Sequence, residues 1–102
     1  MPCGSFSKSP DEAFPVVINM RGRLPTGRTI TRATLAAVDL GDNSTATTTV
    51  LARASATITD SYLAEASVKA GTAGHRYEIL FDLFDTGNSH YCQSLVMLVR
   101  AE

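Results

Sequence analysis

Hydrophobic and polar residues alternate along several short stretches of this chain, a period of two that is typical of β-strands with one buried face. The clearest stretch is residues 75–84, where four large side chains share one face: Tyr77, Ile79, Phe81 and Leu83. A second stretch, residues 64–69, places three small apolar side chains on one face: Ala64, Ala66 and Val68. Because the glycine-containing turn at 70–74 separates the two stretches, they are predicted to form a β-hairpin.

The last stretch, residues 91–100, breaks the alternation because both of its faces are apolar. One face carries Leu95, Met97 and Val99, and the other carries Val96 and Leu98. A strand that is apolar on both faces is usually covered on both. Another region of sheet or another chain would supply the second cover. The alternative is a few isolated aliphatic side chains, which are common on protein surfaces.

A candidate contact surface follows from this second face. If the preceding strand shares the same sheet face, Leu80 joins Val96 and Leu98 in one apolar patch. These three residues are the predicted protein contacts of the chain. Replacing Val96 or Leu98 with lysine is expected to weaken association while the fold persists. Unfolding of the variant would instead assign these side chains to the core.

Shorter and less regular strands are predicted in the first half of the chain. Residues 14–20 are apolar and β-branched, and residues 29–38 point three side chains one way: Ala33, Leu35 and Ala37. Residues 45–59 are rich in Thr, Ala and Ser, and they hold one or two strands, around residues 50–51 and 56–58. The threonines in this segment disfavour a long helix because β-branched side chains lose rotamer freedom there.

About seven short strands separated by turn signals indicate an all-β sandwich or barrel. Residues 13–102 are predicted to form this single domain, which fits a chain of 102 residues. Residues 1–12 are rich in Ser, Pro and Gly and are predicted to be a flexible N-terminal arm that orders on assembly.

The charge of the chain gives no support to nucleic-acid binding. Nine Lys and Arg balance ten Asp and Glu, for a formal net charge of −1, whereas phosphate backbones are recognised by clustered cations. One basic stretch holds Arg21, Arg23, Arg28 and Arg32. It is interpreted either as a contact for phosphate or an acidic partner, or as a solvated loop and strand start.

Targeting signals are also missing from the pattern. No stretch approaches the roughly 20 apolar residues of a membrane helix, and residues 1–20 lack the apolar core of a signal peptide. The chain is therefore expected to have no membrane partner and to be made in the bacterial cytoplasm.

The two cysteines are Cys3, in the predicted arm, and Cys92, near the start of the last strand. They are interpreted as free thiols in a reducing compartment, and a disulfide between them stays open. No Cys and His cluster has the spacing of a metal site. Neither a metal nor a cofactor nor a small-molecule substrate is predicted.

Two arrangements of polar residues are candidate sites. Ser89 and His90 stand near Asp85, but neighbours on one turn rarely converge as a catalytic triad. A calcium site would need Asp82 and Asp85 to meet the carboxylates of residues 11–12, and no spaced acidic loop is present. The chain is therefore predicted not to be an enzyme. An enzyme or metal-dependent domain remains as a rival interpretation.

Several motifs resemble a family of small tailed-phage and prophage proteins. They are KSPDE at residues 8–12, GRTI at 27–30, ATL at 33–35, and VKAGTAG at 68–74 followed by YEILF at 77–81. The resemblance spans residues 8–100. It implies an immunoglobulin-like β-sandwich of about seven antiparallel strands, of the kind found in fibre–tail adaptor proteins.

The resemblance further implies a non-catalytic structural or adaptor role in a phage or prophage particle. The partners would be other structural proteins of the particle or further copies of the chain, and the chain would end in the virion if assembled. The alternative is a β-sandwich module that binds carbohydrate or a receptor. That alternative would need aromatic side chains on a concave face, whereas Tyr77 and Phe81 are predicted to point inward.

Overall fold

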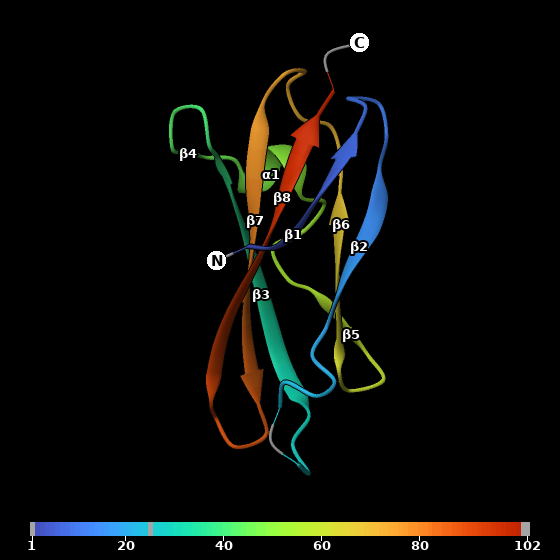
Figure 1. Cartoon of the computed structure of the whole chain (residues 1–102), viewed down its shortest axis with the longest axis vertical. Helices are drawn as coiled ribbons and strands as arrows, with labels where there is room; N and C mark the ends of the chain where they lie inside the picture. Colours follow the sequence, from blue (N-terminus) through green and yellow to red (C-terminus); the bar gives the residue numbers. More distant parts are fainter. Residues whose placement is uncertain (1, 25, 101–102) are drawn as a thin grey trace.

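The computed structural model describes residues 2–24 and 26–100, which form eight β-strands and one short helix (Figure 1). The larger sheet has five strands in the order β1 (Pro2–Lys8), β8 (His90–Val99), β7 (Arg76–Asp85), β3 (Ile30–Asp39) and β4 (Ser44–Thr45). The smaller sheet has three, in the order β2 (Phe14–Asn19), β6 (Leu63–Val68) and β5 (Thr57–Thr59). The helix α1 (Thr47–Val50) is a single turn. The predicted all-β class is confirmed, with one strand more than the seven expected.

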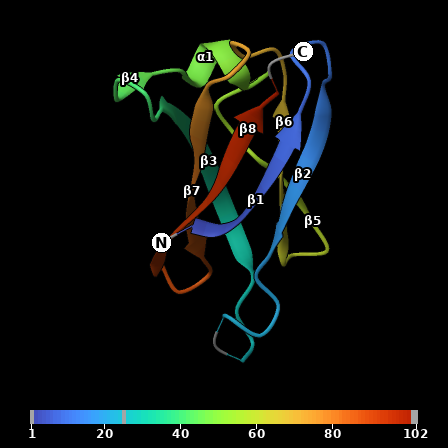
Figure 2. The ribbon, with the colours of Figure 1, turned by 45° about the horizontal axis from the view of Figure 1, so that its top comes forward.

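Residues Pro2–Lys8 form an edge strand, which differs from the flexible arm expected over residues 1–12. Strand β1 runs parallel to β8, with Phe6 opposite Met97. It also lies beside β2, at the side where the two sheets meet (Figure 2). The segment therefore completes the larger sheet.

Two side chains anchor β1 to the rest of the domain. The ring of Phe6 contacts that of Phe14 edge-on, with 5.9 Å between the ring centroids. The side chain of Lys8 is fully buried, and its ammonium group donates hydrogen bonds to the carbonyl oxygens of Ser9 and Ala70. A composition rich in Ser and Gly does not reveal these contacts, because they depend on residues distant in sequence.

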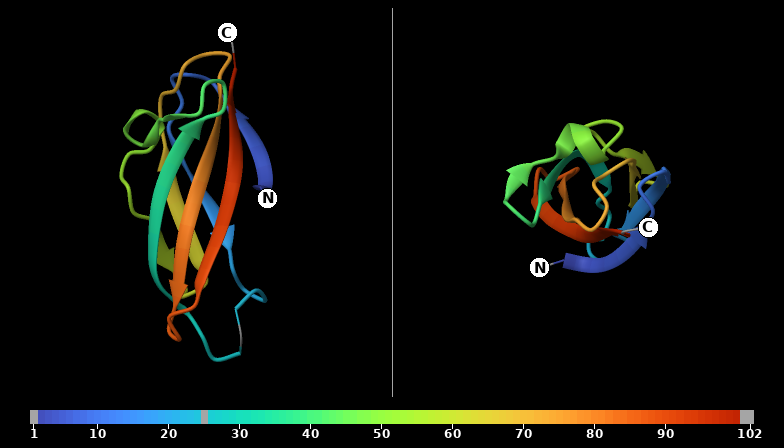
Figure 3. Two further views of the ribbon diagram at one scale, coloured as in Figure 1. Left: turned by 90° about the vertical axis from the view of Figure 1, so that its left-hand side faces the viewer. Right: turned by 90° about the horizontal axis from the view of Figure 1, so that it is seen from above.

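The two sheets face each other around one core, which the strands surround when the domain is seen from above (Figure 3, right). The inward faces are those that the alternation predicted. They are buried on β7 (Tyr77, Ile79, Phe81 and Leu83), on β6 (Ala64, Ala66 and Val68) and on β3 (Ala33, Leu35 and Ala37). The inward positions of Tyr77 and Phe81 are therefore confirmed.

The predicted hairpin between β6 and β7 is wrong, because the two strands belong to different sheets. Residues 69–75 cross between the sheets, with a positive φ at Ala70, Gly71 and Gly74. A Cβ atom added at Gly71 would stand 2.8 Å from Cγ2 of Val99, so the crossing packs tightly on the core. Alternation specifies which face of a strand is buried but not which strand is its neighbour, so a crossing and a hairpin look alike in sequence.

The segment 45–59 contains α1 where a strand was expected around Val50 and Leu51. Both side chains are buried, which two consecutive residues of a strand cannot achieve against one core. Val50 instead ends a helical turn, which is closed by a hydrogen bond from the Val50 N–H to the carbonyl oxygen of Ala46. Leu51 follows in extended conformation and forms an isolated bridge with Val68 of β6. The second strand expected in this segment, at 56–58, is present as β5.

Candidate functional site

The outer face of the larger sheet carries the candidate functional residues. In Figure 3 (left), β3, β7 and β8 lie in front, and no other described element covers them. Even-numbered residues of β7 and β8 point to this face, while most odd-numbered ones point into the core. An apolar group lies toward the end of β8 and a polar cluster lies near the β7–β8 turn. From Cys92 to Leu98 the two regions are about 20 Å apart along the strand.

The apolar group consists of Leu80, Val96 and Leu98, the three residues predicted as protein contacts. Val96 lies opposite Glu78 and Leu80 lies opposite Ser94, so Leu80 and Val96 are diagonal neighbours on one face. Leu98 is 41% exposed, whereas Leu80 and Val96 are half-buried. None of the three belongs to the core.

A shallow groove of about 380 Å³ runs over the upper part of this face. Its lining comes from three strands: Ser5, Phe6 and Ser7 of β1, Arg76 of β7, and Val96 and Leu98 of β8. The register places Ser5 beside Val96 and Ser7 beside Leu98. The two aliphatic side chains therefore lie between a hydroxyl-bearing edge strand and a cationic side chain.

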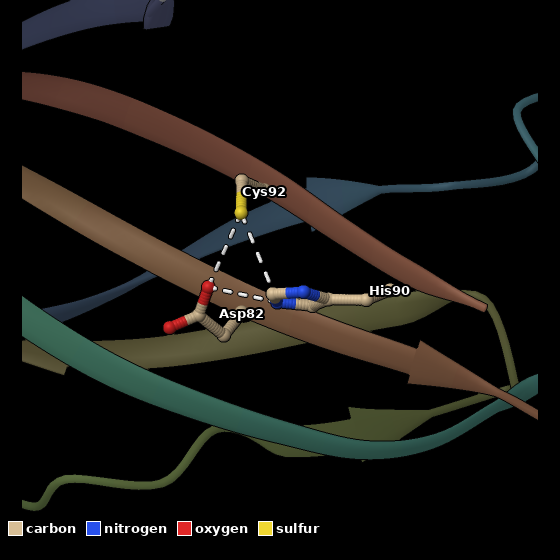
Figure 4. Close-up of side chains that lie close together, drawn as sticks. All are labelled: Asp82, His90 and Cys92. Atoms are coloured by element: carbon tan, nitrogen blue, oxygen red, sulfur yellow. Dashed lines mark hydrogen bonds and ion pairs between the residues drawn. The ribbon is translucent and has the colours of Figure 1, made fainter. Parts of the chain in front are cut away.

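The polar cluster consists of Asp82, His90 and Cys92, which meet on the outer face next to the β7–β8 turn (Figure 4). Oδ1 of Asp82 lies 3.1 Å from Nε2 of His90 and 3.3 Å from Sγ of Cys92, and the sulfur lies 3.8 Å from the same nitrogen. The three donor atoms form one compact triangle. His90 and Cys92 are exposed, so solvent reaches this triangle.

Neighbouring strands fix the orientation of the His90 ring. It stacks on Phe84 with 4.6 Å between the centroids and 6° between the planes. The guanidinium of Arg32 lies 4.2 Å from the centroid of the Phe84 ring. Because the stack runs from β3 through β7 to β8, the imidazole is held by three strands.

The thiol of Cys92 is free and exposed. Its hydrogen bond to the Asp82 carboxylate raises the pKa of Cys92, so the neutral thiol is favoured at neutral pH. The side chain of Cys3 lies outside the described part of the chain.

The structure does not bring Ser89, His90 and Asp85 together as a triad. Asp85 points inward from β7, whereas His90 points outward and contacts Asp82. The hydroxyl of Ser89 accepts a hydrogen bond from Arg28. A relay would need the three side chains on one side of the hairpin, and they lie on opposite sides.

Asp85 instead organises the β7–β8 turn from within. One carboxylate oxygen accepts hydrogen bonds from the N–H groups of Gly87 and Ser89, and the other accepts from Tyr91 and Arg28. Burial raises the pKa of the Asp85 carboxyl, but these hydrogen bonds outweigh it and the net pKa is lowered.

The remaining candidates are also separated. Asp82 and Asp85 point to opposite faces of β7, so they do not assemble as calcium ligands. Within the basic stretch, Arg21 lies over the ring of Tyr62 and Arg32 lies over that of Phe84. These two arginines therefore have separate aromatic partners.

The sequence contained a signal for the polar cluster that was missed. His90 and Cys92 are two positions apart, so they share one face of a strand. The turn centred on residues 85–89 then sets the register that puts Asp82 opposite Cys92. The spacing of metal ligands along the chain does not reveal a site whose residues come together only when two strands pair.

Comparisons of the chain with family models, with curated proteins and with solved structures find no match. Over the described residues, no helix has both the length and the apolar character needed to cross a bilayer.

Proposed function

We propose that this chain is a non-catalytic protein-binding module that serves as a structural or adaptor subunit of a phage or prophage particle. The observation that carries the proposal is the apolar group on an uncovered sheet face. Leu80, Val96 and Leu98 lie on the outer face of the larger sheet, outside the core. An exposed apolar patch with a polar rim is typical of surfaces that bind other proteins.

The strand order supports an immunoglobulin-like arrangement for the sandwich. In such domains a sheet of strands B, E and D packs against one of strands G, F and C, to which C′ is added. Strands β2, β6 and β5 correspond to the first sheet, and β8, β7, β3 and β4 to the second. The phage setting itself rests on the sequence motifs, with residues 68–74 and 77–81 the most specific.

Binding would be passive in this proposal. The face is built on three long paired strands, so its side chains are already positioned before a partner arrives, and little conformational entropy is lost on docking. The groove beside Leu98 is lined by the apolar side chains of Val96 and Phe6 together with Arg76 and two serines. It would suit a partner that inserts an apolar side chain and places a carboxylate or carbonyl against Arg76.

The test uses Leu98→Lys and Val96→Lys, with Val17→Lys as a matched control. Val17 is 48% exposed on β2, so its replacement changes charge equally on the other sheet. We measure solution mass by light scattering across a concentration series at low and high salt. A salt-resistant oligomer lost in the first two variants and kept in the control would support the face as a contact between copies.

A wild-type chain that stays monomeric is tested for its presence in a particle. Particles released by cells that carry the gene are purified and analysed by mass spectrometry. An antibody against the chain provides a second, independent detection. Presence of the wild-type chain and loss of the Leu98→Lys variant support the proposal. Absence of the wild-type chain from particles, together with its monomeric state, would contradict it.

A further inference from the structure

The polar cluster has the composition of a transition-metal site. Asp82 supplies a carboxylate oxygen, His90 an imidazole nitrogen and Cys92 a sulfur, and all three donor atoms lie within 4.8 Å of one another. Carboxylate, imidazole and thiolate are the three protein ligand types of zinc. Calcium and magnesium take oxygen ligands, so a set with nitrogen and sulfur does not suit them.

The distances within the triangle fit one ion. At tetrahedral angles, zinc bonds of about 2.3 Å to sulfur and about 2.1 Å to nitrogen and oxygen separate the donor atoms by about 3.4 to 3.6 Å. In the structure the three separations are 3.1, 3.3 and 3.8 Å. Each edge is within about 0.4 Å of the value that a tetrahedral ion requires. Only small side-chain adjustments would be needed.

The backbone and the ring stack hold the triangle in place before any ion arrives. Asp82 and Cys92 are directly paired across β7 and β8, and the adjoining turn is fixed by the buried Asp85. The stack on Phe84 aligns the His90 ring.

We propose that Asp82, His90 and Cys92 bind one divalent transition-metal ion of the zinc class. The ion takes the place of the Cys92 thiol proton, which is released, and it binds the unprotonated Nε2 of His90, whose ring proton then resides on Nδ1. A tetrahedral ion with three protein ligands keeps a fourth position. On this exposed face that position is open to water or to a donor from a second protein.

This inference does not rest on the apolar group, which lies at the other end of the face. The Leu98→Lys variant is therefore expected to bind metal as the wild type does. Failure of association at Leu98 and failure of metal binding at Cys92 are consequently distinguishable outcomes.

Cobalt(II) is the probe, titrated into metal-free, reduced protein in a buffer that does not chelate. We expect one ion per chain, a sulfur-to-cobalt charge-transfer band in the near ultraviolet, and visible bands with the intensity of tetrahedral coordination. Competition with zinc then gives the zinc affinity. Asp82→Asn, His90→Gln and Cys92→Ser should each weaken binding by more than the roughly 10- to 100-fold that an orienting group contributes.

Cys3→Ser is the matched control, because it removes the other thiol of the chain and leaves the triangle intact. It should keep both the stoichiometry and the charge-transfer band. As a readout independent of absorption, zinc should raise the melting temperature of the wild type and of Cys3→Ser but not that of Cys92→Ser. Circular dichroism confirms that each variant is folded.

Three results would overturn the proposal. The first is the absence of a sulfur charge-transfer band at saturating cobalt. The second is a band that disappears in Cys3→Ser and persists in Cys92→Ser, which would assign the ion elsewhere. The third is unchanged affinity in folded Asp82→Asn and His90→Gln.

Discussion

The buried carboxylate of Asp85 accepts a hydrogen bond of 2.9 Å from the hydroxyl of Tyr91 across the β7–β8 turn. The same carboxylate accepts from the N–H groups of Gly87 and Ser89 at 2.8 and 2.9 Å. One side chain thus ties the turn to both strands that it joins. The apolar group and the polar cluster both depend on the register that this turn sets.

The first prediction concerns the pH dependence that Asp85 gives to stability. Its folded pKa is lowered, whereas the unfolded value is about 3.9. The ionised carboxylate therefore stabilises the fold above the unfolded pKa, and this stability is lost as the pH falls through the folded value. Asp85→Asn should lower the urea midpoint at neutral pH. As the pH is lowered, the urea midpoint of the variant should also fall less steeply than that of the wild type.

Urea midpoints measured from neutral pH to about pH 2 test this prediction. Asp11→Asn serves as the control, since Asp11 is exposed. Tyr91→Phe removes one hydrogen bond and keeps the charge, so it should fall between the wild type and Asp85→Asn. A pH profile of Asp85→Asn that parallels the wild type would show that the carboxylate makes no such contribution.

The second prediction separates an integral β1 from a flexible arm. Lys8 is buried and donates hydrogen bonds to two carbonyl oxygens, whereas the neighbouring Ser7 is exposed. Lys8→Met leaves the Ala70 carbonyl without a donor, while the Ser9 carbonyl keeps the Glu12 N–H, and the variant should lower the free energy of unfolding by about 1–3 kcal/mol. Ser7→Ala should change it by no more than about 0.5 kcal/mol. Urea unfolding measures both, and equal stability of the two variants would favour the arm.

The third prediction tests the crossing between the sheets. At Gly71 φ is 99°, and an added Cβ would stand 2.8 Å from Val99 and 3.4 Å from Tyr77. Gly71→Ala combines backbone strain with overpacking, and the overpacking alone should cost about 1–3 kcal/mol. Gly22 has a φ of 87° with no atom within 4 Å of the added Cβ. Gly22→Ala should therefore lose only the strain, about 1–2 kcal/mol.

Thermal or urea unfolding of the two alanine variants gives this comparison directly. Gly71→Ala is expected to be the less stable of the pair. The opposite order would mean that the packing around Val99 relaxes easily, so that the crossing does not require a glycine there.

The fourth prediction contrasts the two faces of β7. Phe81 is fully buried between the sheets, and Phe84 lies half-buried on the outer face under Arg32. Phe81→Ala should destabilise by about 3–5 kcal/mol. Phe84→Ala should lose mainly its contacts with Arg32 and His90, about 0.5–2 kcal/mol. Calorimetry distinguishes the two, and comparable losses would contradict the assignment of faces.

The sequence was most informative where one strand carries a full inner face of large side chains. The alternation of Tyr77, Ile79, Phe81 and Leu83 predicted β7 and its buried face, and the double apolar character of residues 95–99 predicted β8 correctly. Each of these patterns is local, because a period of two is imposed by the strand itself.

What the sequence could not supply depends on contacts between distant residues. The pairing of β6 with β2 instead of β7, the anchoring of Lys8 under Ala70, and the helical turn at Val50 all follow from tertiary packing. The polar cluster also depends on pairing between strands, because Asp82 lies beside Cys92 only through the register of the β7–β8 hairpin. Propensity and composition do not contain these pairings.

The parallel pairing of β1 with β8 also constrains when the chain can finish folding. Strand β1 is made first and β8 last, so during synthesis β1 has no partner strand until β8 has left the ribosome. Strand β7 can pair with β3 as soon as it is made, but its other neighbour, β8, is made later. The larger sheet therefore cannot complete its pairing until β8 has been made, and unpaired strand edges persist in the nascent chain until then.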